Sequence, residues 1–254
     1  MPSDRTSAGD PARTLALLWR DPAAVPARGP RRTLDLDAVV EAAIALADAE
    51  GLAAVTMRQV AQRVGVAPMS LYTYVPAKAE LLDLMLDAVY ARMPRTDTSG
   101  RPWRERLAVV ADENRALYAA HPWAAAVSTL RPPLGPGQVA KFEHELAALD
   151  GCGLPDVDVD ACLTHLLVFV RACAQDAEAA RVARRESAVD DEQWWASAGP
   201  VLARVLDPAS YPRAVRVGAA AGAAHGSAHD PDHAYAFGLA RLLDGLAALV
   251  DPPR

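Results

Sequence analysis

The spacing of apolar residues constrains this chain more than any other feature. From Leu34 onward, apolar side chains recur at helical intervals almost throughout, and no convincing run of five residues alternates as a half-buried strand does. Glycine and proline divide the pattern into short pieces before about residue 95 and into longer, more apolar pieces after it. We therefore expect an all-α protein with an N-terminal three-helix domain and a C-terminal helical bundle.

The same pattern divides the chain into three segments. Residues 1–33 are rich in proline, arginine, alanine and glycine, and we expect a flexible basic arm with one short helix near 14–20. Residues 34–94 form the first domain and residues 95–254 the second. The stretch 206–230 is expected to be a mobile loop between the last two helices. Helices of the second domain are expected at 102–120, 122–130, 136–150, 156–187, 190–206 and 231–250.

Two short helices joined by a tight turn lie within the first domain. Thr56 and Gln59 have the spacing of a capping box, which fixes the start of one helix. Gly65 supplies the turn, and a very short helix follows from Pro68, since proline suits the first helical position. This pattern is typical of a helix-turn-helix, whose second helix enters the major groove of DNA. With Leu71 as its inward anchor, the outward side chains are Pro68, Met69, Ser70, Thr73 and Tyr74.

The charge pattern supports DNA contact through a local patch. The net charge of -6 argues against general affinity for nucleic acid. No acidic residue occurs between Glu50 and Glu80, however, and a surface without carboxylates favours phosphate binding. Upstream, an arginine cluster either follows the DNA backbone or minor groove or is a solvated tail. The basic residues concerned are Arg58, Arg63 and Lys78 in the gap and Arg28, Arg31 and Arg32 upstream.

Residues 38–89 resemble, without gaps, the DNA-binding domain of the TetR family. The matching features are Glu50-Gly51, Thr56-x-Arg58, Gly65-Val66, Leu71-Tyr72 and the lysine followed by Glu80-Leu81-Leu82. The resemblance implies that Thr56 and Arg58 contact phosphates and that Tyr72 and Lys78 hold the DNA backbone. It also implies that Pro68, Met69, Ser70, Thr73 and Tyr74 enter the major groove.

One position departs from many members of the family. Ala67 stands where they carry serine or threonine as the cap of the recognition helix, which removes a capping bond worth roughly 1 kcal/mol. We expect this helix to be looser in the free protein and to tighten on DNA.

The second domain has the features of a sensor and dimerisation body. Residues 161–170 are apolar around most of a helix, which therefore needs cover on more than one side. The resemblance implies a homodimer on a double-stranded DNA operator, with two helices from each subunit in the interface. His121-Pro122-Trp123 and the stretch 131–137 are similar to the tetracycline-repressor-like branch, which implies a small-molecule effector without specifying it. The last helix carries an apolar stripe: Tyr235, Leu239, Leu242, Leu243, Leu246 and Leu249.

Polar and aromatic side chains within apolar helices are the candidates for effector binding. Arg171 is the most informative, because a guanidinium among apolar neighbours needs a carboxylate, a carbonyl or a ligand as its partner. The alternative for each candidate is a satisfied core side chain, or an interface ion pair in the case of Arg171. The candidates are His121, Trp123, Phe142, His165, Phe169 and Arg171.

Other classes of site fit less well. His225, His229 and His233 are spaced by four, but Gly226 and Pro231 break a continuous helix, so we expect no metal site and no cofactor. No nucleophile-elbow, zinc-protease, phosphate-loop or dinucleotide motif is present, so we expect no enzyme. We expect no membrane span, no signal peptide and a cytoplasmic protein. The three cysteines, which form no CxxC pair, are expected to be buried thiols: Cys152, Cys162 and Cys173.

The sequence therefore predicts a DNA-binding transcriptional regulator, a repressor that a small molecule releases from its operator. The alternatives are an activator, or a regulator that responds to a partner protein or a metal. In the working mechanism, the dimer holds two recognition helices about 34–36 Å apart. A bound ligand then shifts the helix at 78–93 and moves them out of register.

Overall fold

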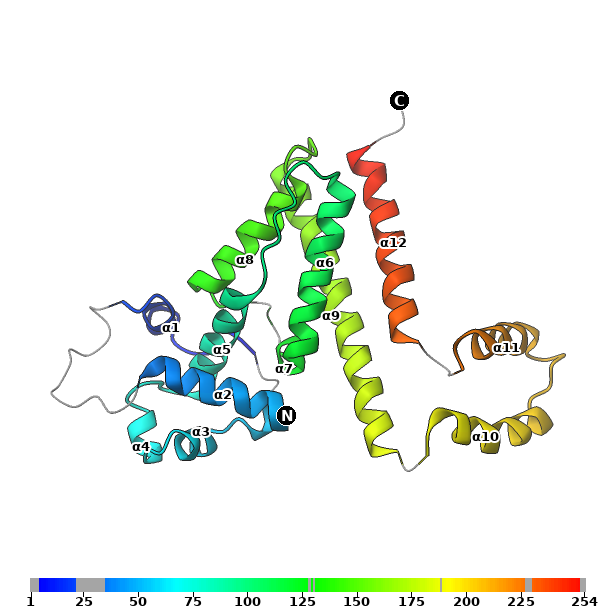
Figure 1. The fold of residues 1–254 in the computed structure, drawn as a ribbon, viewed down its shortest axis with the longest axis horizontal. Helices are drawn as coiled ribbons and strands as arrows, with labels where there is room; N and C mark the ends of the chain where they lie inside the picture. The colour runs from blue at the N-terminus through cyan, green and yellow to red at the C-terminus, as the bar shows by residue number, and fades with distance from the viewer. Residues whose placement is uncertain are drawn as a thin grey trace.

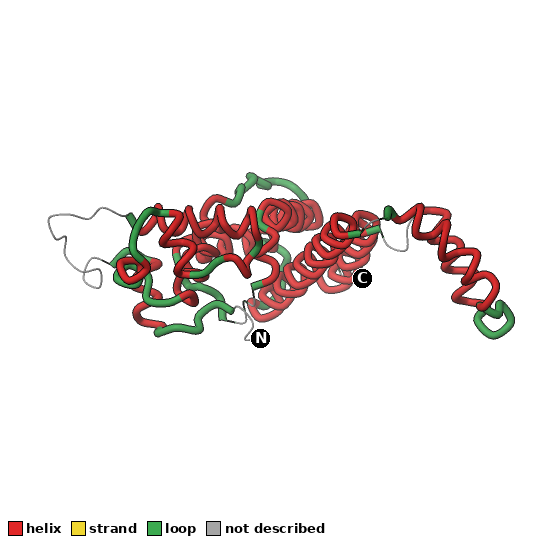
Figure 2. The backbone as a smooth tube through the Cα atoms, turned by 90° about the horizontal axis from the view of Figure 1, so that it is seen from below, coloured by secondary structure: helices red, strands yellow, loops and turns green. Residues whose placement is uncertain are grey.

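The computed structural model describes residues 5–21, 35–127, 129, 131–187, 189–226 and 230–251. Within these ranges there is no β-strand, which confirms the all-α prediction (Figures 1 and 2). Two short 3₁₀ turns lie at Leu52–Ala54 and Ala147–Leu149. The α-helices are α1 (Pro11–Leu18), α2 (Leu36–Glu50), α3 (Met57–Arg63), α4 (Pro68–Leu71), α5 (Lys78–Arg92), α6 (Trp103–Ala120), α7 (Pro122–Ala126), α8 (Pro136–Leu146), α9 (Asp156–Glu186), α10 (Asp191–Val205), α11 (Pro212–His225) and α12 (Pro231–Val250).

Local sequence signals explain the N-terminal domain, in which α2 packs against α3 and α5. The Asp35 side chain caps α2, and Gly51 ends it with a φ of 82°, a left-handed backbone value that glycine adopts without strain. The Thr56 hydroxyl accepts a hydrogen bond from the Gln59 amide at 3.2 Å, as the capping box predicts. Ala67 makes no side-chain cap at the start of α4.

Helix α5 joins the two halves of the protein and buries both of its faces. One face is apolar and belongs to the core that it shares with α2. The other carries three buried acids, Glu80, Asp83 and Asp87, on successive turns. Asp87 lies against the N-terminus of α8, where the Gln138 amide donates to its carboxylate at 2.9 Å. Gly137 permits this approach, since a Cβ there would lie 2.0 Å from the Asp87 carbonyl oxygen.

The N-terminal segment differs from the predicted flexible arm. Residues 5–21 pack against α5, and Thr6, Thr14 and Leu18 are buried there. Helix α1 begins earlier than the expected 14–20 because Asp10 caps it and Pro11 occupies its first position. In the structure, residues 5–21 thus form a packed segment with a short helix. The basic cluster Arg28, Arg31 and Arg32 lies outside the described residues.

The second domain is built from α6, α8, α9 and α12, with α7 at the lower end of α6, where it also contacts α9 (Figure 1). The prediction of a mobile loop over 206–230 is wrong for most of that stretch, because Pro212–His225 forms α11. Proline at its first position and Gly226 after its end supply start and stop signals around an alanine-rich helix. Helices α10 and α11 project away from the remainder of the chain (Figure 1), and none of their described side chains is buried.

We predict that the protein gains stability as the pH falls from 7 to 5. Burial raises the pKa of Asp83 to about 6; the Ser7 amide opposes this, and Glu80 adds to it. Below neutral pH the folded protein therefore binds more protons than the unfolded chain. The free-energy cost of burying the charged Asp83 carboxylate is fully present above about pH 6 and decreases as the pH falls toward 3.8. In thermal unfolding at fixed protein concentration, the free energy of unfolding of the wild type should rise between pH 7 and pH 5 by about 1 kcal/mol more than that of Asp83→Asn. An Asp150→Asn control, which changes an exposed aspartate, should follow wild type; equal pH dependence in all three would contradict the prediction.

Candidate nucleic-acid interface and effector site

The recognition helix α4 presents its side chains to solvent. Leu71 is fully buried and anchors the helix, whereas Met69 is 77% exposed and Pro68 and Ser70 are exposed beside it. Tyr72 and Thr73 at the end of the helix are also exposed. Tyr74 is half-buried and packs against the core, so it is less available than the other expected base-reading residues.

The predicted phosphate contacts lie on the neighbouring elements. Arg58 is exposed on the first turn of α3, which Met57 and Val60 hold against the core. Thr56 is exposed at the helix cap, where its hydroxyl is already engaged with the Gln59 amide. Lys78 begins α5, and its ammonium donates to the Leu52 carbonyl at 3.4 Å. The basic side chains Arg58 and Lys78 and the N-termini of α3 and α5 therefore lie on the elements before and after the exposed α4.

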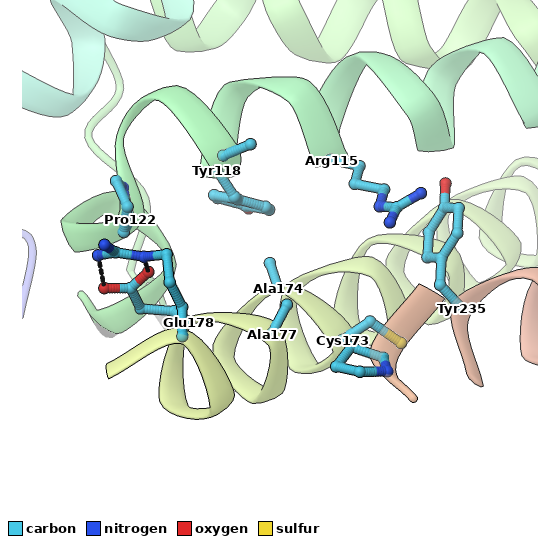
Figure 3. A pocket seen from close by; sticks show the side chains of 11 residues that line it. Arg115, Tyr118, Pro122, Cys173, Ala174, Ala177, Glu178 and Tyr235 are labelled. Atoms are coloured by element: carbon cyan, nitrogen blue, oxygen red, sulfur yellow. Dashed lines mark hydrogen bonds and ion pairs between the residues drawn. The ribbon is translucent and has the colours of Figure 1, made fainter. Parts of the chain in front are cut away.

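The second domain contains a cavity of about 200 Å³ between α6, α9 and α12 (Figure 3). Its walls are mostly apolar, with Tyr118 pointing into it from α6 in the close view. Arg115 lies over the Tyr235 ring at 4.3 Å from the centroid, and the Tyr235 hydroxyl donates to Asp112 at 2.9 Å. Burial, together with this carboxylate, raises the pKa of Tyr235. The cavity therefore offers an aromatic wall with a cation at one end.

A buried polar cluster lies in the interior between α6 and α8. Glu145 is completely buried, and its Oε1 accepts hydrogen bonds from Lys141 and from the Asn114 amide, both at 2.6 Å. Among the described residues, Glu145 Oε2 and Asn114 Oδ1 have no partner. The Lys141 ammonium also lies 5.3 Å from the centroid of the Tyr90 ring. Two buried oxygens are thus left able to accept further hydrogen bonds.

Tyr118 lies near both the cavity and the buried polar cluster. It lines the cavity, and its hydroxyl group interacts electrostatically with Arg171 and with Glu145. Burial raises the pKa of Tyr118 to about 12, so the phenol stays protonated at neutral pH. The side chain therefore lines the cavity and lies within electrostatic range of the buried cluster.

Helix α8 buries its charged side and exposes its apolar side. Lys141 and Glu145 are inside, whereas Val139 and Phe142 are exposed. The apolar spacing of Val139, Phe142 and Leu146 favours the opposite orientation, which is why the sequence analysis missed this pair. The one available signal was two opposite charges four residues apart on a short helix.

The six side chains expected to bind the effector do not gather at one place. His121 Nδ1 and Trp123 Nε1 both contact Asp48 Oδ1 of α2, at 2.8 and 2.7 Å, and so lie where the two domains meet. Phe142 lines a separate hollow of about 510 Å³ near the start of α9. His165 is exposed on α9.

The remaining two candidates lie closer to the cavity without lining it. Phe169 stacks on Tyr235 at a centroid distance of 5.9 Å, and Gly238 leaves room for its ring. The Arg171 guanidinium donates a hydrogen bond to the Thr129 hydroxyl at 3.1 Å, so it has a polar partner within the protein. The residues that sequence reasoning overlooked are Arg115, Tyr118 and Tyr235 at the cavity and Asn114, Lys141 and Glu145 in the cluster.

The histidines near the start of α12 form no metal-binding group in the described part of the chain. The His225 and His233 rings lie 4.7 Å apart, and His225 Nδ1 is 3.5 Å from Asp230 Oδ2. His229 lies outside the described residues.

A four-residue helix held out to solvent by one buried leucine suits the reading of a DNA groove. The protein is thus of the helix-turn-helix class of transcription regulators. Residues 39–85 match the family model for bacterial regulatory proteins of the tetR family. Residues 95–250 match the tetracyclin repressor-like C-terminal domain.

Individual relatives agree with these family matches. The transcriptional repressor DrrR1 of Streptomyces coeruleorubidus is 40% identical over 98% of this chain and 90% of its own length. The structure of apo ActR from Streptomyces coelicolor is 27% identical, with a TM-score of 0.69 over 87% of this chain and 98% of ActR. ActR in complex with actinorhodin is 28% identical, with a TM-score of 0.69 over 86% of this chain and 97% of ActR. The chain belongs to the TetR family and is a DNA-binding repressor regulated by a small-molecule ligand.

We predict that Asp48→Ala destabilises the protein by about 1–2 kcal/mol. Trp123 is 3% exposed, and removal of the carboxylate leaves its indole N–H without this acceptor. Urea unfolding at fixed protein concentration measures the change. Glu50→Ala removes the same charge from an exposed site two residues later and should change stability by less than about 0.5 kcal/mol. An equal loss in the two variants would show that the charge, and not the contact, matters.

Proposed function

We propose that this repressor binds its operator as a homodimer and leaves it when a ligand with hydrogen-bond donors reaches Glu145 and Asn114. The observation that carries the proposal is a pair of buried acceptor oxygens in the second domain that have no partner among the described residues. An unsatisfied buried polar atom costs free energy, so a molecule that supplies the missing donors gains affinity there.

For operator binding we assign two roles. Pro68, Met69, Ser70, Thr73 and Tyr74 read the major groove, with Tyr74 contributing its exposed part. Thr56, Arg58, Tyr72 and Lys78 contact phosphates, which position the helix and supply most of the salt-dependent affinity.

We predict that Arg58→Gln weakens operator binding and reduces its salt dependence. Loss of one phosphate contact in each protomer of a dimer should lower the slope of log K against log salt by about 2. Fluorescence anisotropy with the DNA that flanks the gene for this chain measures the slope between 50 and 200 mM salt, about a fourfold range. Arg213→Gln on α11, an exposed position outside the N-terminal domain, should keep the wild-type slope. If Arg58→Gln kept the wild-type slope, Arg58 would not be a phosphate contact.

For the dimer we assign the faces of α9 and α12 that the chain itself leaves uncovered. Val157 on α9 is 79% exposed and Phe237 on α12 is 57% exposed, with Val168 and Leu249 also exposed. By length and composition, α12 is the one helix of the described chain that also suits a bilayer. It packs along α9, however, and a second copy of the chain would cover the rest of its apolar side. We place the repressor in the cytoplasm with its DNA and assign it no catalytic role.

For the effector we propose a flat, largely apolar molecule that carries hydroxyl or amino groups. It would enter through the mostly apolar cavity beside Tyr118 and present its donors to Glu145 Oε2 and Asn114 Oδ1. Movement of α8 then reaches the DNA-binding domain, because the N-terminus of the same helix donates hydrogen bonds to Asp87 of α5.

We predict that Glu145→Gln raises the effector concentration needed to release the operator by about tenfold or more. A hydrogen bond to a charged group contributes about 1.5–3 kcal/mol, which corresponds to roughly 10- to 100-fold in affinity. The measurement is the concentration of ligand that dissociates half of the operator complex. The first probes are actinorhodin and (S)-DNPA, which ActR binds in its solved complexes.

Two further variants control this experiment. Glu143→Gln removes an exposed charge from the same helix and should release like wild type. Lys141→Met combined with Glu145→Gln leaves no unpaired ammonium in the interior and should retain the weakened release if the single variant is unstable. Unchanged release in the Glu145 variants would place the effector elsewhere.

A further inference from the structure

We propose that residues 5–21 form an intramolecular strap that holds the DNA-binding domain in the orientation required for operator binding. The proposal rests on the proposed operator function, and it concerns a segment that lies outside the helix-turn-helix and outside the effector cavity. The strap contacts three separate parts of the chain.

The strap is bound to the loop that precedes α8. The Thr6 hydroxyl donates to the Arg131 carbonyl at 2.5 Å, and the Ser7 hydroxyl donates to the Pro132 carbonyl at 3.3 Å. The Trp19 indole donates to the Leu134 carbonyl at 2.8 Å. Both ends of the strap thus engage backbone carbonyls of the second domain, more than 100 residues further along the chain.

The strap is also bound to α5 and α2. The Ser7 amide donates to both carboxylate oxygens of Asp83, at 2.9 and 3.2 Å. Gly9 lies so close to Glu80 that a Cβ would stand 2.0 Å from its Oε1. Arg20 forms an ion pair with Asp37 on the first turn of α2. One short segment therefore joins α2, α5 and the loop before α8.

The backbone of the strap is shaped for this contact. Ser7 has a φ of 50°, a left-handed value that is uncommon outside glycine and that points its amide at Asp83. Thr14 and Leu18 on α1 are buried against the rest of the protein, so the helix anchors the segment between its two polar ends. A strained residue held in place by several surrounding contacts is characteristic of a functional constraint.

The consequence for DNA binding follows from geometry. A dimer must present two recognition helices one helical turn of DNA apart. Each DNA-binding domain therefore loses orientational freedom when the dimer binds its operator. The strap removes part of that freedom beforehand, because it fixes α2 and α5 to the second domain. Release of the strap should therefore weaken operator binding without altering any residue that contacts DNA.

The test compares two substitutions at Ser7. Ser7→Pro removes the amide that binds Asp83 and cannot adopt a positive φ, so it should release the strap. Ser7→Gly keeps the amide and adopts the left-handed backbone freely, so it should keep the strap docked. Both substitutions remove the hydroxyl that donates to Pro132, so the comparison isolates the amide and the backbone. Neither substitution changes the charge. Operator affinity of the full-length dimer at constant salt should fall at least fivefold for Ser7→Pro and stay within about twofold of wild type for Ser7→Gly.

Hydrogen exchange of the amides of residues 5–21 in the free protein shows whether the strap is released. Exchange should accelerate in Ser7→Pro and remain slow in Ser7→Gly. If Ser7→Pro lowers the melting temperature of the whole protein, Trp19→Phe, which removes only the donor to Leu134, takes its place. A released strap with wild-type or tighter operator affinity would overturn the proposal. Failure of the wild-type protein to bind the flanking DNA would instead overturn the proposed function, and the strap's role with it.

Discussion

The structure depends on the contact between the buried acids of α5 and the segments that cover them. The start of α8 has no capping side chain of its own, because its cap residue is Gly135. Asp87 of α5 accepts hydrogen bonds from Gly137 and Gln138 in its place. A carboxylate at a helix N-terminus stabilises the helix, so Asp87 of α5 stabilises the start of α8. The two domains are therefore joined by a hydrogen-bonded interaction as well as by chain connectivity.

This arrangement connects distant parts of the molecule through hydrogen bonds to α5. Asp83 and Asp87 lie one turn apart on α5, and they bind the N-terminal strap and α8 respectively. Lys141 and Glu145 lie further along α8, so the buried cluster is connected to α5 through this helix and also through the contact of Lys141 with the Tyr90 ring. Interactions of this kind transmit displacement because packed helices move as units.

The buried polar groups also carry a cost in stability. Removing the charges of Lys141 and Glu145 from water is expensive, and their mutual interaction offsets this only in part. The unpartnered oxygens of Asn114 and Glu145 add to that cost. A core built only for stability would place apolar side chains at these positions, which is the physical basis for assigning them a role in binding.

Much of the N-terminal domain was predictable because its signals are local. The Thr56 cap, the glycine turn at Gly65 and the anchor Leu71 act within a few residues of one another, and the structure has each of them in its expected place. The arm and the 206–230 stretch were predicted less well. In both, proline and an aspartate or glycine begin or end a helix: α1 starts before the expected 14–20, and α11 lies where a mobile loop was expected.

The sequence by itself determined the helical class and the outward-facing recognition helix, since both follow from the interval between apolar residues and from short-range capping. Only the tertiary structure decided which face of α8 points inward and what the residues around Ser7 contact. The apolar pattern of α8 favours its Phe142 side, and the partners of Ser7 lie 76 residues away or more. The physical reason is that such choices depend on buried hydrogen bonds between segments far apart in the chain.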